Sequence, residues 1–199
     1  KVLDFLRLRR REDWLIHAVF LRPHPPLIAP APYNTAVNIK NIPAPVRLAS
    51  REVEAATHPY LAEWMKEMSL PGYFDSPLDL HALPEEDRDA MRAVYFGLIT
   101  EVDAQIGRII DHLKATGEYD ETLIIFTSDH GEMLGDHWCW GKGGYFDASN
   151  HVPLIIRDPD APRSARGRQV SAFTESIDLM PTILDWMGSP TPVESMSHS

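Results

Sequence analysis

The chain has 199 residues, of which 44% are hydrophobic and 24% charged, a composition typical of one globular domain and not of a disordered chain. Nineteen basic against twenty-nine acidic residues give a formal net charge of −10, spread along the chain, which argues against nucleic acid or an anionic membrane as a partner. No apolar run approaches the roughly 20 residues of a membrane span. The single cysteine, Cys139, excludes an intrachain disulfide and fits a reducing, cytoplasmic location.

The first expected element is a strand at residues 14–20, WLIHAVF, which is apolar on both alternating faces. Prolines in the following LRPHPP end it, because proline cannot donate to a strand ladder. Residues 23–49 are rich in proline without periodicity, which predicts an ordered, extended surface connection. A weak helical pattern then covers residues 51–68 and is broken at Pro59.

The clearest helix is predicted over residues 84–118. Proline and three acids at its start, followed by Gly117 near its end, are the expected terminal signals. Apolar residues recur at steps of three and four and predict a stripe that packs on a sheet: Tyr95, Leu98, Ile99, Val102, Ile106, Ile109, Ile110 and Leu113.

Two further strands are expected at residues 122–127, TLIIFT, and 152–159, VPLIIRDP. A last helix is expected over residues 176–188, with Asp178 as a cap and Gly188 as its stop. The order strand, helix, strand, strand, helix indicates an α/β fold.

Ionisable side chains gather in the glycine-rich loop that follows the strand at residues 122–127. Asp129 and His130 stand at the carboxyl end of this strand, where open α/β sheets bind ligands. Adjacent strand residues point to opposite faces, so both can reach one ion only if the chain has bent, which Gly131 permits. A carboxylate beside an imidazole suits a divalent cation such as Mn²⁺, Mg²⁺, Ca²⁺ or Zn²⁺. The alternative is a turn acid and a half-buried histidine.

Lys142, in WGKGGYF, has flanking glycines that allow close approach to a phosphate or sulfate, although a solvated loop lysine is the alternative. His24 lies between prolines and can protonate a leaving oxygen, unless it is simply a turn histidine. Asp136 and His137 are interpreted as loop-stabilising. Cys139 is interpreted as a small buried hydrophobic residue.

The segment TLIIFTSDHGEMLGDHWCWGKGGYFDASNHVPLIIRDP resembles the sulfatase family of the alkaline phosphatase superfamily, closest to the phosphonate monoester hydrolase and arylsulfatase-like branch. FLRPHPP, VRLASREVEAATHP, VYFGLITEVDAQIGRIIDHL and SIDLMPTILDWMG extend the resemblance over roughly residues 14–190. It implies an alkaline phosphatase-like fold with a mostly parallel central sheet flanked by helices, incomplete at both ends. Residues 1–199 would be the C-terminal part of a single catalytic domain.

By this resemblance, Asp129 and His130 bind one divalent cation, Lys142 contacts the sulfate or phosphoryl oxygens, and His24 lies near the leaving group. The parent protein would be a metal-dependent hydrolase of small-molecule sulfate, phosphate or phosphonate esters, and a homo-oligomer is compatible with it. The family's formylglycine nucleophile, made in a C/S-x-P-x-R motif, is expected upstream, because none of the 199 residues fits this motif. This chain alone is therefore expected to be inactive.

Two alternatives stay open. The first is a two-zinc phosphodiesterase or phosphotransferase of the same superfamily, which needs a further downstream histidine ligand, with His151 and His198 as the candidates. The second is a non-catalytic, truncated homologue that acts as a binding or structural module.

Overall fold

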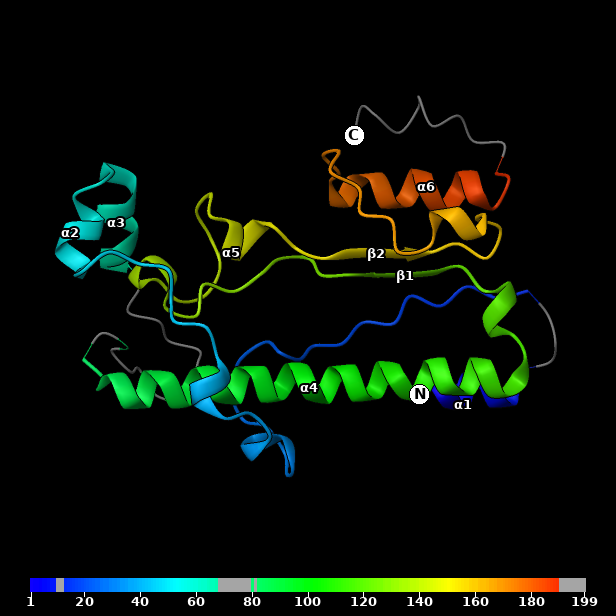
Figure 1. Cartoon of the computed structure of the whole chain (residues 1–199), viewed down its shortest axis with the longest axis horizontal. Coiled ribbons are helices and arrows are strands. Elements are labelled where there is room, and N and C mark those ends of the chain that lie inside the picture. Colours follow the sequence, from blue (N-terminus) through cyan, green and yellow to red (C-terminus); the bar gives the residue numbers. More distant parts are fainter. Residues whose placement is uncertain (10–12, 68–79, 81, 190–199) are drawn as a thin grey trace. The chain divides into compact units, whose positions relative to one another are not determined.

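Two compact units make up the fold, Lys1–Arg157 and Asp158–Ser199. The computed structural model describes residues 1–9, 13–67, 80 and 82–189. Figure 1 labels the helices and strands: α1 (Val2–Leu8), α2 (Arg51–Ala55), α3 (Pro59–Glu67), α4 (Glu85–Thr116), β1 (Ile124–Thr127), α5 (Asp147–Asn150), β2 (Leu154–Arg157) and α6 (Leu179–Trp186). The expectation that residues 1–199 belong to one catalytic domain stays a prediction.

The long helix α4 confirms the helix predicted over residues 84–118. Acidic side chains fill its first turn, where they complement the positive end of the helix dipole. Gly117 ends the helix at φ 78°, a left-handed conformation that suits glycine. Of the predicted apolar stripe, Leu98 and Leu113 are buried, whereas Ile99 is 40% exposed.

Contacts with the N-terminal part of the chain fix helix α4, among them one at Gly97 and one just after the helix at Glu118. A Cβ on Gly97 would lie 2.2 Å from the carbonyl oxygen of Tyr33, so the helix packs directly on the short 3-10 turn that Tyr33 begins. After the helix, the carboxylate of Glu118 pairs with the guanidinium of Arg9, which follows α1. Only a residue without a side chain allows the first of these contacts.

Strands β1 and β2 confirm two of the expected strands and pair antiparallel, with Phe126 opposite Ile155. In the described residues this pair forms a two-stranded sheet, in place of the mostly parallel sheet that was expected. Parallel neighbours need a crossover that returns the chain to the opposite end of the sheet. Residues 128–153 instead contain only short helical turns and bring the chain back at the same end.

The prediction of a strand at residues 14–20 is wrong, because this stretch forms no strand in the structure. Leu15 and Val19 are 62% and 78% exposed, whereas a strand covered on both faces would bury them. A strand is defined by its ladder partner, and neither β1 nor β2 takes that place.

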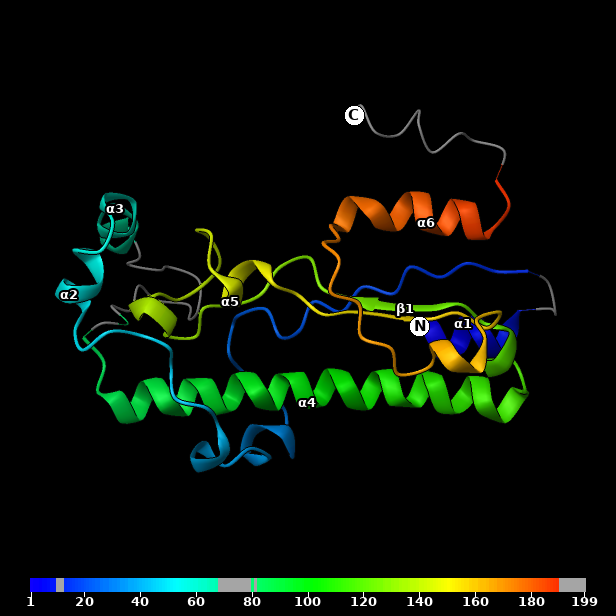
Figure 2. The ribbon, with the colours of Figure 1, turned by 45° about the horizontal axis from the view of Figure 1, so that its top comes forward.

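The helical pattern predicted over residues 51–68 forms two helices, α2 and α3, and Pro59 is the first residue of α3. The core of the first unit lies around α3, the start of α4 and the glycine-rich loop (Figure 2). Its buried residues are Leu27, Leu61, Met65, Leu80, Met91, Leu98, Met133, Cys139 and Trp140. In the described part of the chain, no helix has the length and hydrophobicity that a membrane crossing requires.

In the second unit, α6 confirms the last predicted helix, and Gly188 follows it at φ 68°. Asp178 does not cap α6 with its side chain. Its Oδ2 instead accepts a hydrogen bond from the backbone N–H of Glu175, at 2.8 Å, and closes the 3-10 turn Ser176–Asp178.

Candidate active site

Three of the four predicted site residues meet at the carboxyl end of β1. The Nζ of Lys142 lies 2.6 Å from the Nε2 of His130. The same Nε2 lies 3.5 Å from the Oδ2 of Asp129. Carboxylate, imidazole and ammonium groups therefore converge on one point, although Lys142 is separated from His130 by a whole loop.

When the ring of His130 is neutral, its hydrogen bonds decide which ring nitrogen carries the proton. Its Nδ1 lies 2.8 Å from the carbonyl oxygen of Gly131, an oxygen that can only accept, so the Nδ1–H donates there. The lone pair of Nε2 then faces the ammonium of Lys142, which can only donate. In this tautomer Nε2 is the ring nitrogen that could bind a cation, which would take the place of the Lys142 ammonium at its lone pair.

The side chain of Asp129 is 85% accessible, against 31% for that of His130. Its Oδ1 accepts a hydrogen bond from the backbone N–H of His130 at 3.1 Å. Desolvation is the largest single influence and raises the pKa of this carboxyl. His130, backbone hydrogen bonds and Lys142 together outweigh it and hold the pKa below its usual value. The carboxylate is thus kept in the anionic form that a cation site needs.

The turn that carries Asp129 and His130 is fastened to α5. Backbone N–H groups of Gly131 and Glu132 donate to the carbonyl oxygens of Ser149 and Ala148, at 2.7 and 2.9 Å. A Cβ on Gly131 would lie 2.0 Å from the Ala148 oxygen. Glycine is therefore required here for close approach of two backbones, and Gly131 is not among the glycines of positive φ.

The turn that carries Lys142 is fastened to the same serine. The hydroxyl of Ser149, which is 2% exposed, accepts a hydrogen bond from the N–H of Gly143 at 2.8 Å. The N–H of Gly141 donates to Oε1 of Glu132 at 2.5 Å. Ser149 thus holds the turn of Asp129 and His130 through its carbonyl oxygen and the turn of Lys142 through its hydroxyl.

The remaining loop residues have the structural roles expected of them. Oδ1 of Asp136 accepts from the N–H of Val46 at 2.8 Å, and Nδ1 of His137 lies 2.9 Å from Oε1 of Glu54. The ring of His137 stacks on Phe146 with 4.0 Å between centroids. These contacts confirm that Asp136 and His137 stabilise the loop. Glu54, which is only 4% exposed, was not singled out from the sequence.

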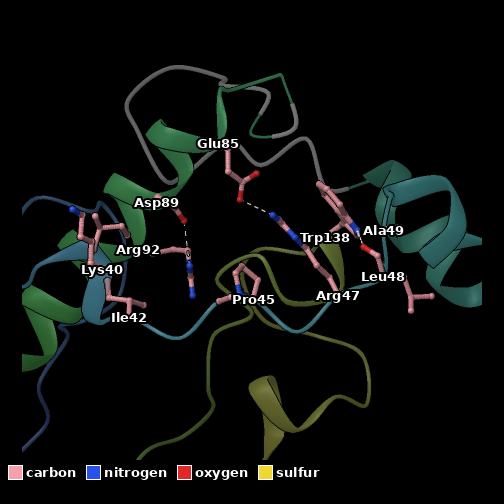
Figure 3. Close-up of a pocket in the computed structure, with 12 residues that line it drawn as sticks. Lys40, Ile42, Pro45, Arg47, Leu48, Ala49, Glu85, Asp89, Arg92 and Trp138 are labelled. Atoms are coloured by element: carbon pink, nitrogen blue, oxygen red, sulfur yellow. Dashed lines mark hydrogen bonds and ion pairs between the residues drawn. The ribbon is translucent and has the colours of Figure 1, made fainter.

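Cys139 is buried with 0% exposure, which confirms its expected place in the core. Beside it, Trp138 forms one wall of a cavity of about 510 Å³ (Figure 3). The guanidinium of Arg47 lies 4.0 Å from the Trp138 ring centroid and pairs with Glu85 at 2.5 Å. These contacts join the start of α4 to the segment before α2, so the cavity wall supports the loop that carries the site.

His24 stands apart from the other three predicted residues in its contacts. Its Nδ1 lies 2.6 Å from the carbonyl oxygen of Pro25 and its ring is exposed. No hydrogen bond or ion pair joins it to Asp129, His130 or Lys142, all of which belong to the described part of the chain. Its role near a leaving group stays a prediction.

The donor set fits a divalent cation in part. Asp129 supplies an anionic oxygen and His130 an unprotonated Nε2, both suited to Mn²⁺, Mg²⁺ or Zn²⁺. Among residues 1–9, 13–67, 80 and 82–189, no group of three or more His, Cys, Asp or Glu could hold a metal ion. Among the described residues, Asp129 and His130 are thus a pair of candidate ligands without a third His, Cys, Asp or Glu beside them.

The sulfatase family model matches residues 1–189, so the chain belongs to the sulfatase family. It is 43% identical, over 193 residues, to the multifunctional alkaline phosphatase superfamily protein PehA of Trinickia caryophylli, an alignment that covers 96% of this chain. It is 30% identical, over 200 residues and 98% of this chain, to an arylsulfatase of Clostridium perfringens.

Solved structures confirm the fold class. The phosphonate monoester hydrolase of Agrobacterium radiobacter matches 94% of this chain with a TM-score of 0.84 and 47% identity. That of Silicibacter pomeroyi matches 94% with a TM-score of 0.82 and 48% identity. The chain spans only 37% of either structure, 37% of PehA and 39% of the clostridial arylsulfatase.

Proposed function

We propose that this chain is the part of an ester hydrolase that supplies Asp129 and His130 to one divalent cation and Lys142 to a sulfuryl, phosphoryl or phosphonyl group. The observation that carries the proposal is the meeting of Lys142 Nζ with His130 Nε2, at 2.6 Å, next to the Asp129 carboxylate. The relatives named arylsulfatase and phosphonate monoester hydrolase support small-molecule esters as the substrates.

Charge explains what each residue does. A divalent cation bound by Asp129 and His130 would polarise the S–O or P–O bond. The ammonium of Lys142 neutralises an oxygen of the tetrahedral group, and neighbouring glycines let that group approach the backbone. The Nδ1–H bond of His130 to Gly131 holds the imidazole in the tautomer that binds a cation.

No stretch of these 199 residues fits C/S-x-P-x-R, so we infer that the family's formylglycine nucleophile lies outside them. We therefore expect this chain alone to hydrolyse no aryl sulfate or aryl phosphonate. His24 remains our candidate for protonating the leaving oxygen. A cytoplasmic location and a homo-oligomeric state also stay predictions.

The test measures the binding of two probes to this chain and does not require catalytic turnover. Mn²⁺ binding is followed by electron paramagnetic resonance, and binding of methylphosphonate in the presence of Mn²⁺ by calorimetry. Asp129→Asn and His130→Ala should each weaken Mn²⁺ binding at least tenfold, whereas Lys142→Ala should weaken methylphosphonate binding without weakening Mn²⁺ binding, because it removes an ammonium group from Nε2 of His130. Exposed Asp103 on α4 provides the matched control Asp103→Asn. Unchanged Mn²⁺ affinity in both ligand variants would refute the metal role, and unchanged methylphosphonate affinity in Lys142→Ala would refute the anion role.

The two-zinc alternative has less support. The His151 side chain is exposed and makes no hydrogen bond or ion pair with Asp129, His130 or Lys142, which are all described residues. His198 lies outside the described residues. A second Mn²⁺ equivalent lost in His151→Ala would favour this alternative.

A further inference from the structure

Lys142 lies in the centre of a tight turn in which the residue on either side is a glycine. Gly141 has φ 77° and Gly143 has φ 149°, both in the region that favours glycine. A lysine side chain is a flexible four-carbon stem, so its ammonium group samples many positions unless the backbone that carries it is held. The contact of 2.6 Å between Nζ of Lys142 and Nε2 of His130 therefore indicates that other groups fix this turn.

Two side chains hold the turn, one on each side of Lys142. Oε1 of Glu132 accepts a hydrogen bond from the N–H of Gly141 at 2.5 Å. Oγ of Ser149 accepts a hydrogen bond from the N–H of Gly143 at 2.8 Å. Because Ser149 is 2% exposed, water has little access to its hydroxyl, and a hydrogen bond shielded from water is electrostatically stronger. The two residues that flank Lys142 are thus each fixed by a side-chain oxygen.

The ring of Trp64, on α3, packs directly on the same turn. A Cβ placed on Gly143 would lie 3.0 Å from Cζ2 of Trp64, and one placed on Gly144 would lie 3.1 Å from Cζ3. Phe146 stacks on this ring, with 6.3 Å between centroids, and supports it. The turn is therefore packed against an aromatic ring as well as tethered by two hydrogen bonds, which leaves the backbone of Lys142 little freedom.

The two tethering residues also connect Lys142 to the turn that carries the candidate cation ligands. Glu132 belongs to that turn itself, two residues after His130. The carbonyl oxygen of Ser149 accepts the N–H of Gly131 at 2.7 Å. Loss of either side-chain oxygen would therefore release the Lys142 turn and leave the backbone hydrogen bonds of the other turn in place.

We propose that Glu132 and Ser149 are positioning residues that set the place of the Lys142 ammonium group. They act through the backbone of the turn and not by touching the anion. Their effect on anion binding rests on the proposed function, in which Lys142 contacts the sulfuryl, phosphoryl or phosphonyl group. Their effect on the contact between Lys142 and His130 does not rest on it, since that contact involves residues of this chain alone.

The first measurement follows the ring nitrogens of His130 by nuclear magnetic resonance, without metal or anion, in mildly alkaline solution where imidazoles are neutral. Lys142→Ala removes the ammonium and should move the Nε2 signal towards that of a nitrogen without a hydrogen-bond donor. Ser149→Ala and Glu132→Ala should move it in the same direction, because the ammonium then samples positions away from the ring. Nδ1 should change little, since its bond to Gly131 stays. An Nε2 signal unchanged in either tether variant would overturn the assignment of that residue.

Two further variants separate positioning from general destabilisation. Glu132→Gln keeps an oxygen that can accept the N–H of Gly141 and should retain the native Nε2 signal, whereas a signal like that of Glu132→Ala would overturn the tethering role of this oxygen. Leu113→Ala removes a side chain buried on α4, outside the core cluster around the loop, and should leave Nε2 unchanged. A shift in Leu113→Ala as large as that in Ser149→Ala would show an effect of stability alone and would overturn the proposal.

The second measurement is the binding of methylphosphonate in the presence of Mn²⁺, and of Mn²⁺ alone. Ser149→Ala and Glu132→Ala should weaken methylphosphonate binding about two- to tenfold, without weakening Mn²⁺ binding. If Lys142→Ala leaves methylphosphonate affinity unchanged while Nε2 still responds to Ser149→Ala, the anion role fails and the positioning of Lys142 stands. If methylphosphonate binding depends on Lys142 but on neither tether, the proposed function stands and the positioning role in anion binding is overturned.

Discussion

The Oε1 of Glu54 lies 2.9 Å from the Nδ1 of His137 and joins α2 to the glycine-rich loop 83 residues later. The other carboxylate oxygen, Oε2, accepts the N–H of Leu48 at 2.6 Å. One buried carboxylate therefore binds both the N–H of Leu48 and the ring of His137. The loop of the candidate site depends on this acid, although Glu54 contacts none of Asp129, His130 or Lys142.

The variant Glu54→Ala should lower the free energy of unfolding by about 2–5 kcal/mol, because it leaves the N–H of Leu48 and the ring of His137 without an acceptor. Urea denaturation followed by tryptophan fluorescence measures the change. Glu63→Ala is the matched control, since Glu63 pairs with Lys66 at the exposed surface of α3, and it should change stability by less than about 1 kcal/mol. Similar losses in the two variants would contradict the structural role of Glu54.

Gly131→Ala should destabilise the fold by about 1–3 kcal/mol, because its Cβ would meet the carbonyl oxygen of Ala148 at 2.0 Å and force two backbones apart. Gly107→Ala provides the comparison. It lies inside α4 with no heavy atom near its Cβ position, and it should stabilise the chain by about 0.5–1 kcal/mol. Both are measured as shifts of the urea midpoint, and a stabilising Gly131→Ala would refute the close packing of the turn on α5.

Cys139 should be inert to thiol reagents in the folded chain. Burial, reinforced by the nearby Glu54 carboxylate, raises the pKa of its thiol to about 12 from 9.0. Alkylation by iodoacetamide at pH 8 should therefore be much slower in the folded chain than in urea, as mass spectrometry can follow. Because the folded pKa is the higher one, the associated stability is complete below pH 9 and is lost as the pH rises towards 12. Equal folded and unfolded rates would contradict the burial.

Arg9 and Glu118 should give the fold an acid-sensitive contact. The hydrogen bond from Arg9, followed by that from Thr116, holds the pKa of Glu118 below 4.5. A depressed carboxyl pKa contributes stability that is present above pH 4.5 and is lost as the pH falls through the folded value. Glu118→Gln should therefore cost about 1 kcal/mol at pH 7 and much less at pH 3, measured by urea denaturation. The same cost at both values would show that the charge of Glu118 is not involved.

Local signals in the sequence predicted local structure well. The ends of α4 follow from the acids after Pro84 and from Gly117, since capping depends on residues within one turn of the helix end. The prediction of a strand at residues 14–20 was wrong because a strand depends on a partner distant along the chain. Its apolar character was correct, but a strand also needs a neighbouring strand, and no property of the segment itself supplies one.

The difference between local signals and contacts distant along the chain also explains which residues of the candidate site could be predicted. Asp129 and His130 could be predicted because they follow a strand and precede a glycine, and the structure brings Lys142 to them. The pairing of Glu54 with His137 could not be predicted, because it connects positions far apart and only a folded chain makes the acid buried. The family and fold class were predicted because motifs spread along the chain agree with one another, as the match over residues 1–189 confirms.

Ser149 connects the two turns that carry the candidate site residues. Because its carbonyl holds the Gly131 turn and its hydroxyl holds the Gly143 turn, the spacing between the Asp129–His130 pair and Lys142 is set by one short helix, α5. Any displacement of α5 would therefore move both turns together, so this spacing is inherited from the position of the helix and not from the loop itself.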